Sequence, residues 1–506
     1  MQVVRPLPRV RAALGMNLSG PADWNSELPF VDVFRLSRQW ISQREGAGWG
    51  QGPALDLDAN GWVKRLEPGC YAETLMNTID PGPDGRPRYP GGTYTVLYDG
   101  DGDLRFWNAA RVVRSEPGRI QIEVDPSRGA IFLQIRRTNP NNHVRNIRVI
   151  MPGFESSYLK NPFHPKFLQR WSGIACLRFM DWGETNNSRI ERWTDRPTLQ
   201  TATWTARGVP MEVMCDLCNR LQCDAWICIP HRADDDYAER AARLVREKLN
   251  PRLRVWLEYS NELWNGIFSQ HRYASERGRE LNLGGSGADW EYAWRYTAYR
   301  SVQIFDIWRP LLGNRVIRVL PVWFANAWVS ERIVEFQQAY RSADVMAIAP
   351  YLGTTFTPDS NPSADEVSRW TVEQALDYLE NNDLPQCVQL LREQSALARK
   401  YNLRLVAYEG GTHFLSAGGA ENNERLTQFI MATNRHSRIA SIYRRYYRAW
   451  EKQGGWLFNY FASTSTWSKW GCWGILEYRD QDPREAPKYV ATVEWARRLG
   501  QKMQVV

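Results

Sequence analysis

The sequence feature that most constrains the fold is an alternation of short apolar runs with amphipathic segments, which holds from about residue 154 to the C-terminus. The apolar runs are rich in β-branched and aromatic residues, and most of them are followed by helical patterns. This alternation is typical of a parallel sheet joined by crossover helices. With one further run near the N-terminus, the strands number eight, which closes a (β/α)8 barrel. The sequence therefore predicts an α/β fold of the TIM-barrel type.

The expected elements can be given by residue range. The predicted strands are residues 14–20, 175–180, 225–230, 255–259, 315–322, 345–349, 403–408 and 455–460. The predicted helices are residues 30–42, 210–223, 236–248, 289–308, 331–340, 390–401 and 423–453.

Residues 51–153 follow a different pattern, dense in glycine and proline with short alternating segments. The clearest of these segments are residues 93–98, 119–124, 130–135 and 144–150. Several short strands at such spacing indicate a β-sandwich. We therefore expect an inserted all-β domain between the first and second barrel strands. The division is residues 1–50 for the first part of the barrel, 51–153 for the β-sandwich-like domain and 154–506 for the rest of the barrel.

Aromatic residues are the unusual part of the composition, with 24 Trp and 22 Tyr among 506 residues. Flat, partly exposed rings suit the faces of sugar rings and also of nucleobases. Within the inserted block, two readings stay open: these rings bind sugar, or they pack the domain's own core. The aromatic residues concerned are Trp62, Tyr71, Tyr94, Tyr98 and Trp107.

The charge and hydropathy of the chain limit its partners. The net charge is +8, but Lys and Arg are interspersed with Asp and Glu, which favours a solubility role over a nucleic-acid partner. No apolar run approaches the roughly 20 residues that span a bilayer, so we expect no membrane partner. Residues 1–9 lack the apolar region of a signal peptide.

Four cysteines have a spacing similar to that of a zinc knuckle, C-x2-C-x4-C-x4-C. They are Cys215, Cys218, Cys223 and Cys228. However, residues 210–223 have a helical pattern and residues 226–229 a strand pattern, and cysteines on such faces are typically small core residues. We expect no metal and no organic cofactor. Disulfide pairing among the other cysteines stays open.

Polar side chains stand where the predicted strands end. Asn261 and Glu262 follow the run 255–259, and Glu409 follows the run 403–408 and precedes two glycines. The C-terminal ends of the strands in a (β/α)8 barrel meet at one face, where catalytic groups lie. Two carboxylates from distant parts of the chain predict an enzyme. The further strand-end candidates are Asn17, Arg178, Asp181, His231, Tyr351, His413 and Trp470.

In these residues the chain resembles a clan A retaining glycoside hydrolase, closest to the family 5 group. The resemblance covers about residues 10–45 and 155–500 and leaves out the β-rich block. It implies that Glu262 is the acid/base, that Asn261 binds the sugar 2-hydroxyl, and that Glu409 is the nucleophile.

The resemblance also implies the residues that bind substrate. Arg178 matches an arginine near the nucleophile, His231 a histidine after the third strand, and Tyr351 an aromatic residue after the sixth. His413 joins this set as a further residue after the seventh strand. The tryptophan expected after the eighth strand fits Trp467, Trp470 and Trp473 alike, and Trp470 is the candidate chosen. Glu258, inside the fourth strand, is expected to pair with a barrel arginine.

The implied activity is hydrolysis of β-glycosidic bonds in a polysaccharide or oligosaccharide, with an endo-acting, cellulase-like β-glucanase favoured because loop tryptophans suggest several subsites. A mannanase or xylanase on the same scaffold and a non-catalytic carbohydrate-binding protein are the alternatives, and a nucleic-acid-binding protein is a more distant one. An extracellular or periplasmic location is expected, although no signal peptide is visible. The oligomeric state stays open.

Overall fold

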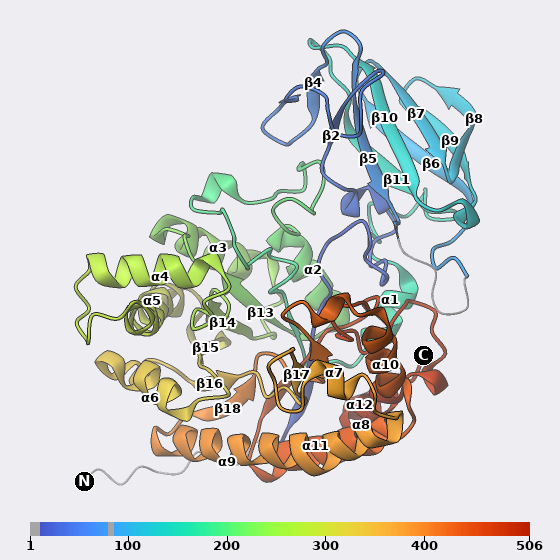
Figure 1. Ribbon diagram of the computed structural model, residues 1–506. Coiled ribbons are helices and arrows are strands. Elements are labelled where there is room, and N and C mark those ends of the chain that lie inside the picture. Colours follow the sequence, from blue (N-terminus) through green and yellow to red (C-terminus); the bar gives the residue numbers. More distant parts are fainter. Residues whose placement is uncertain (1–10, 79–85) are drawn as a thin grey trace.

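A computed structural model describes residues 11–78 and 86–506, so the N-terminal segment without a signal-peptide pattern lies outside the described residues. At its centre, eight parallel strands form a closed barrel, in which β1 pairs with both β12 and β20 (Figure 1). The predicted (β/α)8 barrel is confirmed. The barrel strands are β1 (Ala13–Asn17), β12 (Cys176–Arg178), β13 (Asp224–Ile229), β14 (Val255–Tyr259), β15 (Val316–Pro321), β16 (Val345–Ile348), β18 (Arg404–Ala407) and β20 (Leu457–Phe461).

Helices surround the barrel (Figure 1). They are α1 (Pro165–Trp171), α2 (Met211–Leu221), α3 (Asp235–Lys248), α4 (Ser269–Glu280), α5 (Asp289–Leu312), α6 (Ala327–Glu335), α7 (Ala364–Val367), α8 (Val372–Tyr378), α9 (Leu384–Lys400), α10 (Glu424–Arg435), α11 (Ile439–Lys452) and α12 (Pro487–Arg498). Single turns of 3-10 or π type are η1 (Val33–Leu36), η2 (Pro126–Arg128), η3 (Trp193–Asp195), η4 (Gly313–Arg315), η5 (Phe336–Arg341), η6 (Leu379–Asp383), η7 (Ala420–Asn422) and η8 (Pro483–Glu485). The segment 423–453, predicted as one helix, is two, because the chain turns at residues 436–438.

Strand β14 and helix α3 illustrate how the sequence determines these elements. Every residue of β14 is buried, as expected for a parallel strand with side chains in the barrel interior on one face and under helices on the other. Helix α3 begins after Asp234, whose side chain accepts a hydrogen bond of 2.7 Å from the backbone N–H of Tyr237. Asp235 and Asp236 in the first turn add a favourable interaction with the helix dipole.

The block between β1 and β12 contains two four-stranded antiparallel sheets, which confirms an inserted all-β domain at this point of the chain. One sheet is β2 (Ile41–Arg44), β5 (Cys70–Met76), β10 (Ile131–Thr138) and β7 (Gly102–Asn108). The other is β11 (Arg145–Ile150), β6 (Gly92–Asp99), β9 (Arg119–Val124) and β8 (Ala110–Glu116). Buried residues of both sheets, such as Val96 and Leu133, form one apolar core. Two small two-stranded sheets are β3 (Asp56–Leu57) with β4 (Val63–Arg65), and β17 (Thr355–Phe356) with β19 (Leu415–Ser416).

The helix predicted for residues 30–42 is wrong, since this segment forms only the single turn η1 and then enters the sheet as β2. The apolar spacing serves two cores instead of one helix face. Phe30 packs in the barrel core, whereas Phe34 stacks on Trp62 of the β domain with ring centroids 5.6 Å apart. Because β2 pairs with β5, the sheet draws its first strand from residues ahead of position 51.

The first barrel helix is therefore α1, which follows the β domain, and the insertion leaves the barrel at the C-terminal end of β1. The domain is held against the segment between β12 and α2. Its Trp62 donates from Nε1 to the Gln200 carbonyl at 3.1 Å, and its Asn60 carbonyl accepts from the Ala202 N–H at 2.8 Å. The β domain thus stands at the same end of the barrel as the strand-end polar residues (Figure 1).

The structure shows where some of the aromatic residues of the β domain and all of the cysteines lie. Trp62 and Tyr94 lie in the core of the β domain, whereas Trp107 is 44% exposed. All eight cysteines are buried free thiols, and Cys215 and Cys218 lie on α2. Among the described residues, no helix combines the length and apolar character needed to cross a membrane.

Candidate active site

Arg178 is the centre of the site and is fully buried at the end of β12. Its Nη1 donates to Oδ1 of Asn17 at 3.1 Å and to Oε1 of Glu409 at 2.7 Å. Its Nη2 donates to Oδ1 of Asn261 at 2.8 Å, and its Nε to Oε2 of Glu258 at 2.9 Å. One guanidinium group therefore joins side chains from the ends of β1, β14 and β18, as the barrel topology requires of strand-end residues.

Glu258 lies below this group, inside the barrel. Neither Glu258 nor Arg178 has an exposed side-chain surface, and they form an ion pair of 2.9 Å. Glu258 Oε2 also accepts from Nε1 of Trp226 at 2.7 Å. The expectation that Glu258 pairs with a barrel arginine is confirmed, and its role is to hold Arg178 in place.

The turn after β14 directs Glu262 to the mouth of the barrel. Ser260 and Glu262 have φ angles of 59° and 45°, in the left-handed region. Such conformations cost on the order of 1 kcal/mol each for non-glycine residues and persist where surrounding contacts impose them. Here the Ser260 N–H donates to the Ile229 carbonyl at 2.8 Å, and Gln270 Nε2 donates to the Asn261 carbonyl at 3.0 Å.

The Glu262 carboxyl group is surrounded by donors and by a neighbouring charge. Tyr408 donates its hydroxyl to Oε1 at 3.3 Å, and Asn265 donates Nδ2 to Oε2 at 3.0 Å. Burial, and second to it the negative charge of Glu409, raises the pKa of Glu262 to about 8. Glu262 is therefore protonated at neutral pH.

Glu409 follows β18 and is 5% exposed. Besides the Arg178 bond at Oε1, its Oε2 accepts from the Tyr351 hydroxyl at 2.9 Å. Both donors stabilise the charged carboxylate. The next residue must be glycine, because a Cβ at Gly410 would lie 2.4 Å from Cζ of Phe458. The site thus contains two carboxyl groups in different surroundings, the kind of arrangement that separates a proton donor from a nucleophile.

An aromatic group adjoins Glu409. The ring centroid of Tyr351 lies 5.4 Å from that of His413 and 5.6 Å from that of Trp473. Burial lowers the pKa of His413 to about 4, so this ring is neutral at neutral pH. Trp470 is instead 64% exposed, with its ring against Lys469. Trp473, which the sequence did not distinguish from its neighbours, is the tryptophan that packs on Tyr351.

His231 lies apart from the Arg178 group. Its ring packs against Tyr273 at 5.2 Å, and burial lowers its pKa to about 4. In the described part of the chain, no hydrogen bond joins His231 to Arg178, Glu262 or Glu409, and its Nδ1 has no partner. It lines a separate cavity of about 530 Å³.

Two contributors to the site were not expected from the sequence. Tyr408 looked like a core residue of its strand, but its hydroxyl reaches Glu262. Asn186 lies in the loop after β12 and accepts from Nδ2 of Asn261 at 3.0 Å. Tyr408 is the last residue of the predicted run 403–408, and Asn186 lies where no strand-end pattern marks it.

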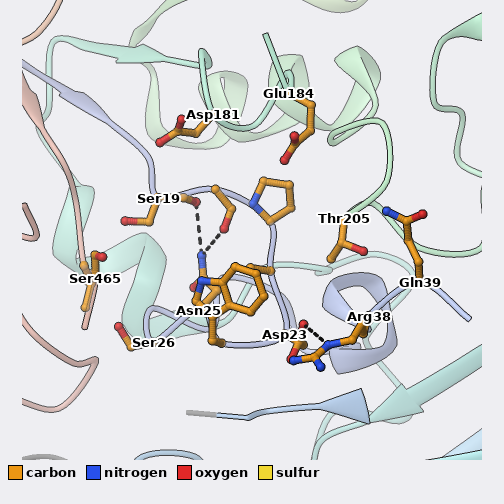
Figure 2. Close-up of a pocket in the computed structure, with 15 residues that line it drawn as sticks. Ser19, Asp23, Asn25, Ser26, Arg38, Gln39, Asp181, Glu184, Thr205 and Ser465 are labelled. Carbon is orange, nitrogen blue, oxygen red and sulfur yellow. Dashed lines mark hydrogen bonds and ion pairs between the residues drawn. The ribbon is translucent and has the colours of Figure 1, made fainter. Parts of the chain in front are cut away.

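A cavity of about 500 Å³ is lined by Asp181 and Glu184, which follow β12. Figure 2 shows Asp181 and Glu184 on one side of it and Asn25, Asp23 and Arg38 on the other. Burial raises the pKa of Asp181 and of Glu184 to about 7, and for Asp181 the charge of Glu409 adds to the effect. Arg38 is paired with Asp23 at 2.7 Å. The cavity therefore offers hydrogen-bonding groups, and the positive charge of Arg38 is already paired with Asp23.

Within the described residues, no group of three or more His, Cys, Asp or Glu side chains is arranged to hold a metal ion.

Comparisons with known proteins add the following. No family model and no curated protein matches the chain. Among solved structures, the chain is similar to a GH51 arabinofuranosidase from Xanthomonas axonopodis pv. citri (14% identity, TM-score 0.40, 60% of this chain and 61% of that chain). It is also similar to a 4-O-α-L-rhamnosyl-β-D-glucuronidase from Fusarium oxysporum 12S (12% identity, TM-score 0.39, 67% and 66%). A third is a GH5-4 broad specificity endoglucanase from Clostridium acetobutylicum (13% identity, TM-score 0.35, 66% and 90%).

The chain thus spans 61% of the length of the arabinofuranosidase. At these TM-scores, the functional conclusion rests on the site itself.

Proposed function

We propose that the protein is a retaining glycoside hydrolase that cleaves β-glycosidic bonds, with Glu409 as nucleophile and Glu262 as acid/base. The observation that carries the proposal is the different surroundings of two carboxyl groups at the ends of β14 and β18. Glu262 has a pKa raised to about 8, whereas Glu409 accepts hydrogen bonds from Arg178 and Tyr351. Retaining glycosidases use such a pair with the carboxyl groups about 5–5.5 Å apart.

In the first step, a Glu409 oxygen attacks the anomeric carbon while Glu262 gives its proton to the glycosidic oxygen. The bond between that carbon and oxygen breaks, and a glycosyl ester forms on Glu409. Arg178 and Tyr351 orient the attacking carboxylate through their bonds to Oε1 and Oε2. Asn261 donates one amide N–H to Asn186, and the second N–H is the group we assign to the sugar 2-hydroxyl.

In the second step, Glu262 acts as the base. The ester on Glu409 carries no charge, so the electrostatic contribution that Glu409 makes to the raised pKa of Glu262 disappears. Glu262 then takes a proton from water, whose oxygen attacks the anomeric carbon and releases Glu409 as a carboxylate. Two displacements return the original anomeric configuration.

For the substrate, we propose a β-glucan cut internally. Support comes from the cavity of about 500 Å³ lined by Asp181, whose pKa the charge of Glu409 raises, and from the exposed Trp24 in the same lining. The cavity has room for sugar beyond the cleaved bond. If the enzyme hydrolyses mannan or xylan in preference to glucan, the proposed substrate changes and the proposed reaction stays the same. Because such polymers do not enter cells intact, we place the enzyme outside the cytoplasm, in the periplasm or the medium, which cell fractionation tests.

The decisive experiment compares Glu409→Ala and Glu262→Ala with Glu247→Ala, which removes an exposed carboxylate on α3. We expect the first two variants to lose at least a thousandfold in kcat on aryl β-glycosides and the third to keep it. Azide should restore turnover in Glu409→Ala and yield the glycosyl azide of inverted configuration. Wild-type activity in either glutamate variant, or an inverted sugar released by the wild type, would exclude this mechanism.

A further inference from the structure

A second and larger cavity, of about 950 Å³, lies between the inserted β domain and the barrel. The β domain lines it with Leu57 to Gly61, and Trp40 lies at the start of this domain. The barrel lines it with residues 184–191 and 201–207, which belong to the connection between β12 and α2. Figure 1 shows the β domain standing above this connection. Its volume lies at the upper end of the range of about 300–1,000 Å³ for ligand pockets.

This cavity lies next to the candidate active site. Asn186 lines it, and the same side chain accepts a hydrogen bond of 3.0 Å from Asn261, the neighbour of Glu262. Gln39, Glu184 and Thr205 line both this cavity and the cavity of about 500 Å³ that Asp181 lines. The two cavities therefore adjoin and form one cleft, and Asn186 joins its lining to the neighbour of Glu262.

The lining has the chemistry of a sugar-binding surface. Amide and hydroxyl side chains are the larger part of its polar lining, among them Asn60, Asn186, Asn187 and Ser188, and Trp40 adds a partly exposed ring. Charged side chains of both signs are present, such as Glu191 and Arg189, so the lining does not favour a ligand of one charge sign. Hydroxyl-rich, uncharged chains suit such a lining, with sugar hydroxyls at the amides and an apolar sugar face on the ring.

The wall formed by the β domain is held firmly in place. Backbone and side-chain hydrogen bonds join Trp62 to Gln200 and Asn60 to Ala202. Ala202 is 2% exposed and packs in the apolar core of the β domain, although it belongs to the barrel connection. The cleft is thus bounded by two parts of the chain that share one core.

We propose that the inserted β domain forms one wall of the substrate cleft, in which a neutral polysaccharide chain extends from Glu262 and Glu409 into the cavity between the domain and the barrel. This rests on the proposed function for the position of the cleaved bond. The domain acts as a binding surface that is part of the cleft, and its aromatic core residues are not the contact surface.

The test introduces bulk into the cleft by Ala59→Trp, at an exposed position of the lining. Val113→Trp is the matched control, because Val113 is 46% exposed on β8 and is not part of the cleft lining. The readout is the ratio of kcat/KM on a soluble polysaccharide to kcat/KM on an aryl β-glycoside. We expect this ratio to fall at least tenfold in Ala59→Trp and to change less than twofold in Val113→Trp, with equal melting temperatures.

Affinity electrophoresis in gels containing β-glucan, β-mannan or xylan separates the cleft from the chemistry. We expect at least one polysaccharide to retard the wild type and Val113→Trp, and to retard Ala59→Trp much less. An unchanged kcat/KM ratio together with unchanged retardation in Ala59→Trp would overturn the proposal, as would the absence of retardation of the wild type by every polymer. Retardation without any hydrolysis by the wild type would instead contradict the proposed function and leave the cleft supported.

Discussion

Arg178 and Glu409 are joined by a hydrogen bond of 2.7 Å between Nη1 and Oε1, and the arginine has no exposed surface. The same guanidinium group is paired at 2.9 Å with Glu258, deeper in the barrel. A single buried cation thus faces two carboxylates, one structural and one in the candidate active site. Because these groups are shielded from water, the loss of any one of them leaves its partners uncompensated.

The first prediction concerns stability. Replacing Arg178 with methionine leaves Glu258 buried without a cation, and we expect the free energy of unfolding to fall by about 3–5 kcal/mol at pH 7. Urea unfolding followed by tryptophan fluorescence measures the loss. Hydrolysis should fall as well, because Glu409 loses the donor at Oε1.

A double-mutant cycle gives the control. Glu258→Gln removes the buried negative charge, so Arg178→Met combined with Glu258→Gln should cost less than the sum of the single variants. Strict additivity, or a loss in Arg178→Met of less than about 1 kcal/mol, would show that the pair is not energetically coupled.

The second prediction concerns Tyr351. Tyr351→Phe removes the hydroxyl that donates to Glu409 at 2.9 Å and keeps the ring that packs on His413 and Trp473. In the proposed mechanism, that hydroxyl stabilises Glu409 as it leaves the glycosyl ester as a carboxylate. We expect kcat to fall by about a hundredfold, comparable to the loss of one oriented donor. Mass spectrometry of the intact protein should detect accumulated glycosyl-enzyme.

Tyr340→Phe serves as the comparison, since Tyr340 precedes β16 and packs against Tyr401 at 5.1 Å. It should keep full turnover. A Tyr351→Phe enzyme with wild-type kcat and no trapped intermediate would show that Tyr351 does not assist Glu409.

The sequence predicted those parts of the fold that local patterning determines. The strand predicted for residues 255–259 has the same bounds in the structure, because a strand buried on both faces is a largely apolar run, interrupted here only by Glu258. The helix predicted for the segment from Phe30 to residue 42 does not form, because tertiary contacts determine the structure of this segment. Its apolar side chains contact two separate cores, which no helical periodicity records.

The residues of the candidate site also fall into those that the sequence predicts and those that it does not. Arg178, Asn261 and Glu409 meet because barrel closure brings strand ends together, whatever the loops do. The position of Trp473 depends instead on the path of the loop after β20, and three tryptophans within seven residues are equivalent in sequence. Tyr408 could not be predicted because its hydroxyl finds a partner from another strand.

The third prediction concerns the pH dependence of hydrolysis. In the proposed mechanism, Glu262 must be protonated to donate. Its pKa is raised to about 8, so kcat/KM should be lost as the pH rises through about 8. The measurement is the pH profile of kcat/KM on an aryl β-glycoside with a poor leaving group. A dinitrophenyl glycoside needs little protonation and should lack most of this alkaline decline. The same alkaline decline for both substrates would exclude Glu262 as the proton donor.

The fourth prediction uses Glu27, a buried carboxyl group that the proposed reaction does not use. It is 1% exposed and accepts from Ser463 Oγ at 2.6 Å and from Trp171 Nε1 at 2.7 Å. Burial outweighs these donors and raises the pKa of Glu27 from 4.5 to about 7. The folded protein therefore holds a proton that the unfolded chain releases between these two pH values.

The direction of the effect on stability follows from this linkage. The contribution of Glu27 is fully present below pH 4.5 and is lost as the pH rises to about 7, after which it is constant. The total is about 3 kcal/mol. Glu27→Gln mimics the protonated form and does not titrate, so relative to the wild type it should gain about this amount between pH 4.5 and pH 8. Urea unfolding of both proteins at several pH values measures the difference, with the exposed Glu239→Gln as control. A difference between Glu27→Gln and the wild type that is the same at every pH would show that Glu27 titrates alike in the folded and unfolded chain.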